Sequence, residues 1–180
     1  ETVRREVFAP RRYGDLARQD VALPLPSGET MTSPTTVALM LTALAVQPGL
    51  RVLELGTGSG YVTALLATLG GHVLSVERKE VLLDSARQRL RAAGIERCEL
   101  VCRDGLEASA VEGQFDRILV NGALAGGAVP PSLTSRLASG GRLVAGSSGE
   151  GGTRILVMER GENGELAVGQ GPKVRLSRFS

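Results

Sequence analysis

Residues 50–61 combine a short apolar run with three alternating glycines, and they read Leu50-Arg51-Val52-Leu53-Glu54-Leu55-Gly56-Thr57-Gly58-Ser59-Gly60-Tyr61. Val52, Leu53 and Leu55 make a short apolar run of the kind expected for a central parallel strand that is buried on both faces. Glycine tolerates positive φ angles and carries no side chain that would keep a ligand away from the backbone. Apolar residues with helical spacing follow Tyr61, so the glycines are predicted to lie in a strand-to-helix turn, where free N–H groups can bind an anionic group.

The spacing of the glycines distinguishes two classes of cofactor. A dinucleotide fingerprint, Gly-x-Gly-x-x-Gly, would require a glycine at position 61, and Tyr61 stands there instead. The observed form, Glu54-x-Gly56-x-Gly58-x-Gly60, resembles the first motif of S-adenosylmethionine-dependent methyltransferases. The resemblance implies that the turn holds the methionine part of S-adenosylmethionine, and that an acidic residue after the next strand holds the ribose.

Two acidic residues follow later predicted strands at suitable places. Glu77 ends the strand 72–76, about where a carboxylate is expected to accept hydrogen bonds from ribose hydroxyls. Asp104 follows the predicted strand 98–102, and the resemblance implies that it meets the adenine amino group with Leu106 beside the ring. A simple Asp-Gly turn and a solvated glutamate are the alternative interpretations, which the combined order of strand, glycines, helix, strand and acid disfavours. The predicted cofactor-binding residues are Glu54, Gly56, Thr57, Gly58, Ser59, Gly60, Tyr61, Glu77, Arg78, Asp104, Gly105 and Leu106.

Length and composition limit the remaining possibilities. A chain of 180 residues with 42% hydrophobic content can bury a core as one domain, 1–180, without disulfides or metal. Only 3% of the residues are aromatic and the net charge is +2, so no nucleic-acid surface is predicted. No apolar stretch has the length of a membrane span and no signal sequence opens the chain, so we expect a cytoplasmic protein and no membrane partner.

The two cysteines and the single histidine argue against disulfide or metal chemistry. Cys98 and Cys102 lie four residues apart on a predicted strand, which separates their Cα atoms by about 13 Å. A disulfide cannot span that distance, and the pair is typical of a reducing compartment. His72 is expected to be an exposed strand residue, and no metal site is predicted.

The N-terminal segment, residues 1–33, is polar and interrupted by prolines, so it is predicted to be extended and to lie over the site. Ser33 can cap a helix that begins at Pro34 and presents one apolar face up to Pro48-Gly49. Further helices are predicted at 79–93, with Val81 facing inward, and at 133–138. Residues 34–180 are expected to form the catalytic core.

The C-terminal third changes from alternating strands and helices to strands alone. Predicted strands at 115–120 and 142–145 are followed by 155–158 and 165–168, which flank the hairpin signal Asn163-Gly164. A last strand is predicted at 173–179. The pattern predicts an α/β fold with a doubly wound, mostly parallel, seven-stranded Rossmann-like methyltransferase sheet and antiparallel C-terminal strands, the order of the last two being left open.

Several segments together resemble the protein-L-isoaspartate O-methyltransferase family over nearly the whole chain. They are Phe8-Ala9-Pro10, Tyr13-Gly14-Asp15, Gly28-Glu29-Thr30-Met31-Thr32-Ser33-Pro34, the glycine motif with its ending Gly58-Ser59-Gly60-Tyr61, Val76-Glu77-Arg78, Asp104-Gly105, Phe115-Asp116-Arg117-Ile118, and Leu133 through Gly141-Arg142-Leu143-Val144. The resemblance implies methylation of the abnormal α-carboxyl of L-isoaspartyl residues, and of D-aspartyl side chains, in damaged proteins, with S-adenosylhomocysteine as the second product. A carboxylate is already an anionic nucleophile at neutral pH, so the scarcity of histidine is no obstacle.

The substrate side is predicted from the same resemblance. The family usually has serine at the position of Thr32, and its hydroxyl is thought to meet the substrate, which makes Thr32 the catalytic candidate. The predicted substrate-binding residues are Thr32, Ser33, Asn121 and Gly122. Departures from the family pattern at Thr32, Asn121, Arg136 and Ala145 are interpreted as clustering on this side.

Those departures keep two other hypotheses open. A methyltransferase of the same fold could act on another small-molecule or peptide carboxylate, and a non-catalytic module could have kept only the cofactor pocket. The complete set of cofactor residues favours an enzyme over such a module. The oligomeric state is left open, with a monomer favoured.

Overall fold

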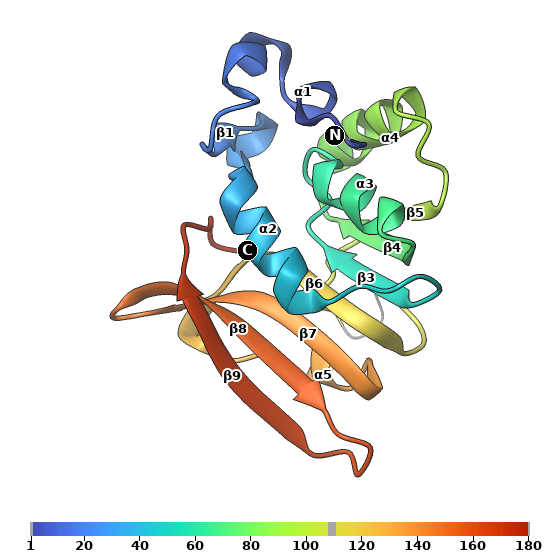
Figure 1. Ribbon diagram of the computed structural model, residues 1–180, viewed down its shortest axis with the longest axis vertical. Helices are drawn as coiled ribbons and strands as arrows, with labels where there is room; N and C mark the ends of the chain where they lie inside the picture. Colours follow the sequence, from blue (N-terminus) through green and yellow to red (C-terminus); the bar gives the residue numbers. More distant parts are fainter. Residues whose placement is uncertain (1, 108–110, 180) are drawn as a thin grey trace.

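The structure is a computed structural model that describes residues 2–107 and 111–179. Its centre is a seven-stranded sheet in the order β5-β4-β3-β6-β7-β8-β9 (Figure 1). The strands are β3 (Arg51–Leu55), β4 (His72–Glu77), β5 (Cys98–Cys102), β6 (Phe115–Leu124), β7 (Leu137–Gly149), β8 (Gly152–Arg160) and β9 (Leu166–Lys173). The first five are parallel, whereas β7, β8 and β9 form an antiparallel meander. The predicted fold class is confirmed, and the order of the last two strands is now settled.

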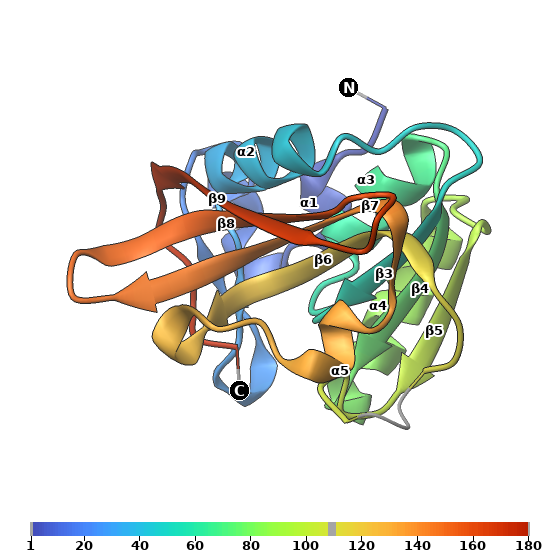
Figure 2. The same ribbon diagram turned by 90° about the horizontal axis from the view of Figure 1, so that it is seen from below.

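Helices cover both faces of the sheet, as Figure 2 shows for α2 and α3 on one face and α5 on the other. The helices of the main fold are α2 (Pro34–Leu44), α3 (Tyr61–Thr68), α4 (Glu80–Ala92) and α5 (Pro131–Thr134), with a short 3-10 turn η3 (Ala125–Gly127). Strand β3 is buried on both sides: Val52 belongs to the core cluster under α2, α3 and α4, and Leu53 and Leu55 belong to the cluster on the α5 side. This double burial explains why apolar residues of β3 point to both faces of the sheet.

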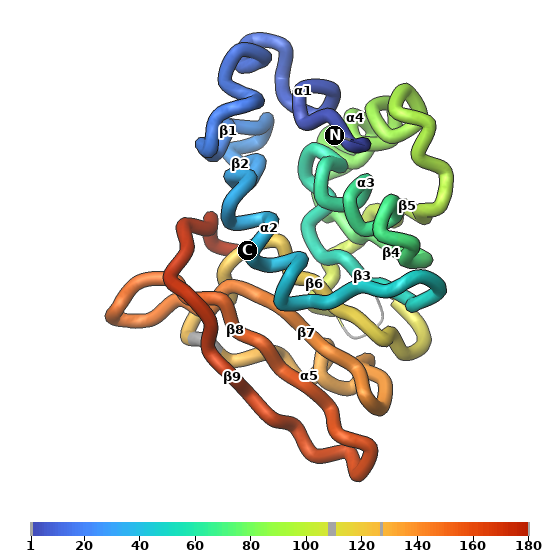
Figure 3. Tube along the Cα trace, in the orientation of Figure 1, coloured from blue at the N-terminus to red at the C-terminus, as the bar shows by residue number. Residues whose placement is uncertain are grey.

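The N-terminal segment is not extended throughout, and that prediction was wrong. It contains α1 (Arg5–Phe8), the 3-10 helices η1 (Arg11–Leu16) and η2 (Pro26–Gly28), and a two-stranded sheet of β1 (Leu23–Pro24) and β2 (Thr30–Met31). Pro10 and Pro26 stand at the starts of helical turns, where a missing N–H and a fixed φ are tolerated. The segment runs from α1 beside α4 to the start of α2 (Figure 3).

Two helices differ in detail from the prediction. Helix α2 ends at Leu44, because Ala45 takes a left-handed conformation with φ 51°, and it does not reach Pro48. Ser33 makes no side-chain cap, since its hydroxyl donates to Thr36 Oγ1 at 3.2 Å. Val81 is 57% exposed and not inward, because the buried face of α4 is formed by other residues, namely Leu82, Leu83, Ala86 and Leu90.

The strands after β6 are longer than predicted. The predicted helix 133–138 is limited to α5, because residues from Leu137 onward pair with β6 as part of β7. The predicted strand 173–179 is absent: β9 ends at Lys173, and the tail returns to β6. There Ala123 N–H donates to Ser177 O at 2.9 Å and Phe179 N–H donates to Ala123 O at 2.8 Å. The apolar tail residues that predicted a strand, Val174, Leu176 and Phe179, pack against the two core clusters instead.

The two cysteines and the single histidine lie on strands of the sheet. Cys98 and Cys102 are free thiols on β5, a strand at the edge of the sheet, and His72 is exposed. In the described part of the chain, no helix has the length and apolar character needed to cross a membrane.

Candidate active site

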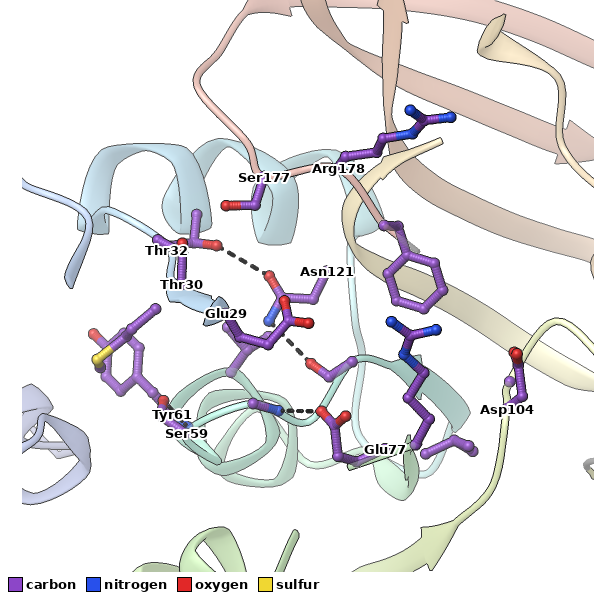
Figure 4. Close-up of a pocket in the computed structure, with 18 of the residues that line it drawn as sticks. Glu29, Thr30, Thr32, Ser59, Tyr61, Glu77, Asp104, Asn121, Ser177 and Arg178 are labelled. Atoms are coloured by element: carbon purple, nitrogen blue, oxygen red, sulfur yellow. Dashed lines mark hydrogen bonds between the residues drawn. The ribbon is translucent and has the colours of Figure 1, made fainter. Parts of the chain in front are cut away.

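A cleft of about 810 Å³, a volume that includes open solvent at its mouth, lies at the carboxyl ends of β3, β4, β5 and β6. In an open parallel sheet this edge is where ligands bind, at the point where the strand order reverses. The lining residues come from six parts of the chain and are Glu29, Thr30, Met31 and Thr32; Gly56, Gly58, Ser59, Tyr61 and Val62; Val76, Glu77 and Arg78; Arg103, Asp104 and Gly105; Asn121; and Ser177, Arg178 and Phe179. Most of them are drawn in Figure 4.

The glycine turn forms the floor of the cleft. Gly56 and Gly58 line it with φ angles of 91° and 54°, values that side-chain-bearing residues rarely adopt. Gly60 is the N-cap residue of α3 and faces α4, because a Cβ there would lie 3.2 Å from the Cβ of Ala86. Two of the three glycines therefore expose backbone to a ligand, and the third permits close packing of two helices.

Glu77 presents its carboxylate to the cleft while the backbone holds it in place. Its Oε2 accepts a hydrogen bond from Gly58 N–H at 3.0 Å (Figure 4). Its Oε1 accepts one from Lys79 N–H, also at 3.0 Å. Each carboxylate oxygen has a second acceptor position. Glu77 is therefore fixed in orientation and can still accept two hydrogen bonds from a ligand such as the hydroxyl pair of a ribose.

Glu54 and Thr57, both predicted to bind the cofactor, do not line the cleft. Glu54 is fully buried, and its Oε2 accepts hydrogen bonds from Thr63 Oγ1 at 2.5 Å and Ser75 Oγ at 2.7 Å. Ser75 Oγ lies 2.6 Å from Thr57 Oγ1. Burial raises the pKa of Glu54 to about 7 against the effect of these hydrogen bonds, and the nearby charge of Glu77 adds to the rise. These side chains support the turn from beneath.

Asp104 closes a local turn and also lines the cleft. Its Oδ1 accepts a hydrogen bond from Leu106 N–H at 3.0 Å, which closes a local turn, and the residue also lines the cleft. Gly105 packs against β3, where a Cβ would lie 2.7 Å from Leu55 Cδ2. Leu106 packs against the core on the α5 side and does not line the cleft.

Thr32 and Asn121 meet at the other end of the cleft, although they are 89 residues apart in the sequence. Thr32 Oγ1 donates to Asn121 Oδ1 at 3.3 Å, and Asn121 Nδ2 donates to Gly56 O at 3.2 Å (Figure 4). The other two predicted substrate-binding residues lie elsewhere. Ser33 lines a separate groove, and Gly122 is buried under Phe179, whose Cβ would be 3.0 Å from a Cβ at that glycine.

Two of the four departures from the family pattern are not on the substrate side, so that interpretation was wrong for them. The Arg136 guanidinium is buried and donates to backbone carbonyl oxygens, including Ser132 O at 2.7 Å and Val111 O at 3.0 Å, and Arg136 does not line the cleft. Ala145 is fully buried in β7.

Sequence reasoning did not single out several lining residues. Glu29, Thr30 and Met31 belong to a segment whose resemblance to the family implies roles only for Thr32 and Ser33. Arg103 directly precedes Asp104 and belongs to no motif of its own. Ser177, Arg178 and Phe179 fall in the predicted strand 173–179, and only the return of the tail to β6 brings them to the cleft.

A sulfonium cofactor attached to a nucleoside fits these residues. The cleft offers bare backbone at Gly56 and Gly58, an oriented carboxylate at Glu77, and a second acid, Asp104, at the end of the next strand. Together with the strand order, this arrangement is that of the Rossmann-like class of S-adenosylmethionine-dependent methyltransferases.

Comparison with known proteins narrows the class to a family. Residues 1–176 match the family model described as protein-L-isoaspartate(D-aspartate) O-methyltransferase, and the chain belongs to that family. A protein-L-isoaspartate O-methyltransferase of Methylorubrum populi is 43% identical over 158 residues, which cover 88% of this chain and 73% of the relative. Protein-L-isoaspartate O-methyltransferase 2 of Rhodopseudomonas palustris strain HaA2 is 41% identical over 167 residues, 92% of this chain and 76% of the relative.

A solved structure shares the fold. The putative protein-L-isoaspartate O-methyltransferase of Plasmodium falciparum, crystallised with S-adenosyl-L-homocysteine, superimposes with a TM-score of 0.82 over 99% of this chain and 87% of that chain. Its sequence identity is 21%, so the likeness is one of fold.

Proposed function

We propose that this protein transfers a methyl group from S-adenosylmethionine to the free α-carboxylate of L-isoaspartyl residues, and to D-aspartyl side chains, in damaged proteins. Membership of the family and the names of its relatives support this activity. The observation in the structure that carries the proposal is a single cleft with the carboxylate of Glu77 at one end and the Thr32–Asn121 pair at the other.

The cofactor half of the cleft is assigned to lining residues near the glycine turn and at the ends of β4 and β5. The Glu77 carboxylate would accept hydrogen bonds from the ribose, Asp104 would face the adenine, and the backbone of Gly56 and Gly58 would hold the methionine part. When bound, the cofactor supplies an electrophilic methyl group on a sulfonium. Ser59, Tyr61, Arg78 and Gly105 also line this half, and we propose that they contact the cofactor.

The substrate half needs donors and not a base, because an isoaspartyl carboxylate is ionised at neutral pH. The Thr32 hydroxyl, which donates a hydrogen bond to Asn121 Oδ1, can turn and donate it to a carboxylate oxygen of the substrate. Asn121 keeps a second N–H beyond the one that it donates to Gly56 O. Two neutral donors can orient a carboxylate without pairing its charge strongly, which preserves its nucleophilicity in the transition state.

The setting of the reaction is inferred from the same features. The partners are proteins or peptides that carry isoaspartate, and the free thiols of Cys98 and Cys102 support a reducing compartment such as the cytoplasm.

The test is transfer of radiolabelled methyl groups from S-adenosylmethionine to paired peptides that differ only in an aspartyl or isoaspartyl linkage. We expect labelling of the isoaspartyl peptide alone, in a base-labile ester. Equal labelling of both peptides would indicate a different carboxylate substrate. Labelling of neither, by a protein that binds S-adenosylhomocysteine in calorimetry, would contradict the proposed substrate and leave the cofactor assignment intact.

A further inference from the structure

Arg5 is a buried arginine that no part of the proposed chemistry uses. Its side chain belongs to α1 and is 2% exposed, yet four backbone carbonyl groups surround its guanidinium. Nη1 donates to Ala17 O at 2.9 Å and to Gln19 O at 3.4 Å. Nη2 donates to Val21 O at 2.9 Å and to Thr32 O at 3.1 Å. The N–H groups of both terminal nitrogens are therefore all used.

One of these four acceptors belongs to a residue that lines the active-site cleft. Three belong to the loop that follows η1, and the fourth is the backbone carbonyl of Thr32, whose side chain faces the cleft. Figure 3 shows the intervening chain leaving α1, turning through β1 and β2, and returning toward α2. One guanidinium thus joins Arg5 to the backbone of Thr32, 27 positions further along the chain.

Helix α1, which carries Arg5, lies next to the helices that surround the glycine turn. Helix α1 packs beside α4, and the Phe8 ring lies 5.9 Å from the ring of Tyr61, which starts α3 and lines the cleft. Arg5 therefore connects the helices that surround the cofactor turn with the residue proposed to meet the substrate.

We propose that Arg5 is a positioning residue for the methyl transfer, which holds the Thr32 hydroxyl in the cleft by fixing the backbone carbonyl of that residue. The inference rests on the proposed function for the role of Thr32. It predicts that the main effect of changing Arg5 falls on the peptide substrate and not on the cofactor.

Arginine suits this task better than lysine. Its planar fork can serve four acceptors from two nitrogens, whereas an ammonium offers three donors from one point on a flexible stem. Burial of four carbonyl groups without these donors would also be unfavourable, so the loop would rearrange. A displacement of about 1 Å at a reacting group can change the rate on the order of 100-fold.

The first experiment compares Arg5→Lys and Arg5→Met with the wild type. We expect kcat/KM for an isoaspartyl peptide to fall on the order of 10- to 100-fold, while the dissociation constant for S-adenosylhomocysteine changes less than about threefold, within ordinary context effects. The neighbouring Arg4 has an exposed side chain, and Arg4→Lys and Arg4→Met are the matched controls. Equal losses of peptide turnover and cofactor affinity in folded Arg5→Lys would overturn the proposal.

The second experiment asks whether Arg5 acts through Thr32. In a double-mutant cycle of Arg5→Lys with Thr32→Val, we expect Arg5→Lys to reduce kcat/KM much less when the hydroxyl is already absent, because coupled residues are not additive. Additive losses would overturn the proposal, because a general loss of stability would act alike on both backgrounds.

A third measurement needs no substrate. Amide hydrogen exchange should rise in residues 17–32 of Arg5→Lys and stay at the wild-type level in α3, as expected for a local opening. Unchanged exchange in residues 17–32 would overturn the proposal. If the wild type did not methylate isoaspartyl peptides, the proposed function would fail, and this measurement would still decide whether Arg5 holds Thr32.

Discussion

The side-chain amide of Asn121 joins Thr32 to the cofactor turn, accepting a hydrogen bond from Thr32 Oγ1 through Oδ1 and donating one to Gly56 O through Nδ2. The two bonds fix which end of the amide is which, since only nitrogen can donate to the Gly56 carbonyl. A displacement of the glycine turn would therefore be transmitted to Thr32 through the side chain of Asn121.

Asn121→Ala should lower kcat/KM for an isoaspartyl peptide by about tenfold, the value of roughly one neutral hydrogen bond, and change cofactor affinity little. Asn121→Asp should lower it further, because a second carboxylate would repel the substrate carboxylate. Steady-state kinetics with varied peptide provide the measurement. Asn163→Ala, in the exposed hairpin between β8 and β9, is the control. Faster turnover by Asn121→Asp would count against this assignment.

Glu77→Ala should weaken binding of S-adenosylhomocysteine on the order of 10- to 100-fold, because hydrogen bonds to a charged group contribute about 1.5–3 kcal/mol. Titration calorimetry measures the affinity directly. Glu162→Ala removes a carboxylate from an exposed position away from the cleft and should leave the affinity unchanged. Retention of full affinity by Glu77→Ala would show that the ribose lies elsewhere.

Gly60→Ala should lower the free energy of unfolding by about 2 kcal/mol or more, because the residue has φ 85° and its Cβ would press on Ala86 of α4. Urea denaturation followed by circular dichroism measures the change. Gly14→Ala is the control, since a Cβ there meets no atom within 4 Å. Equal stabilities of the two variants would refute the proposed packing role of Gly60.

The buried Glu54 should make stability depend on pH. Its pKa is raised from 4.5 to about 7 in the folded protein, so between these values the folded state holds a proton that the unfolded state has lost. The free energy of unfolding should therefore fall as pH rises from about 4.5 to about 7 and level off above that, by on the order of 3 kcal/mol from this group. Glu54→Gln should remove this part of the slope in urea titrations between pH 5 and pH 8. Parallel pH profiles of the two proteins would contradict it.

The local sequence was sufficient to predict the elements whose apolar pattern results from burial within the sheet. Val52, Leu53 and Leu55 are apolar because both faces of β3 are covered, and the glycines that follow need positive φ, so this strand and turn could be predicted. Element ends were less predictable. Ala45 terminates α2 in a left-handed conformation that its residue type does not favour.

The candidate site was predictable where its residues follow consecutive strands. Glu77 and Asp104 end neighbouring parallel strands, so position in the chain implied position at the cleft. Phe179 gave no such signal, because it reaches Gly56 only through hydrogen bonds between the tail and the end of β6.

The amino-acid sequence by itself determined the parallel sheet, the glycine turn and the acids beside it, because periodicity, glycine and strand order act over short distances along the chain. The tertiary structure alone decided that Glu54 lies under the turn and not in the cleft, that Thr32 pairs with Asn121, and that Arg5 holds the backbone of Thr32. Each of these depends on the direction of a side chain toward a segment far away in the sequence, and such directions are fixed only when the layers pack together.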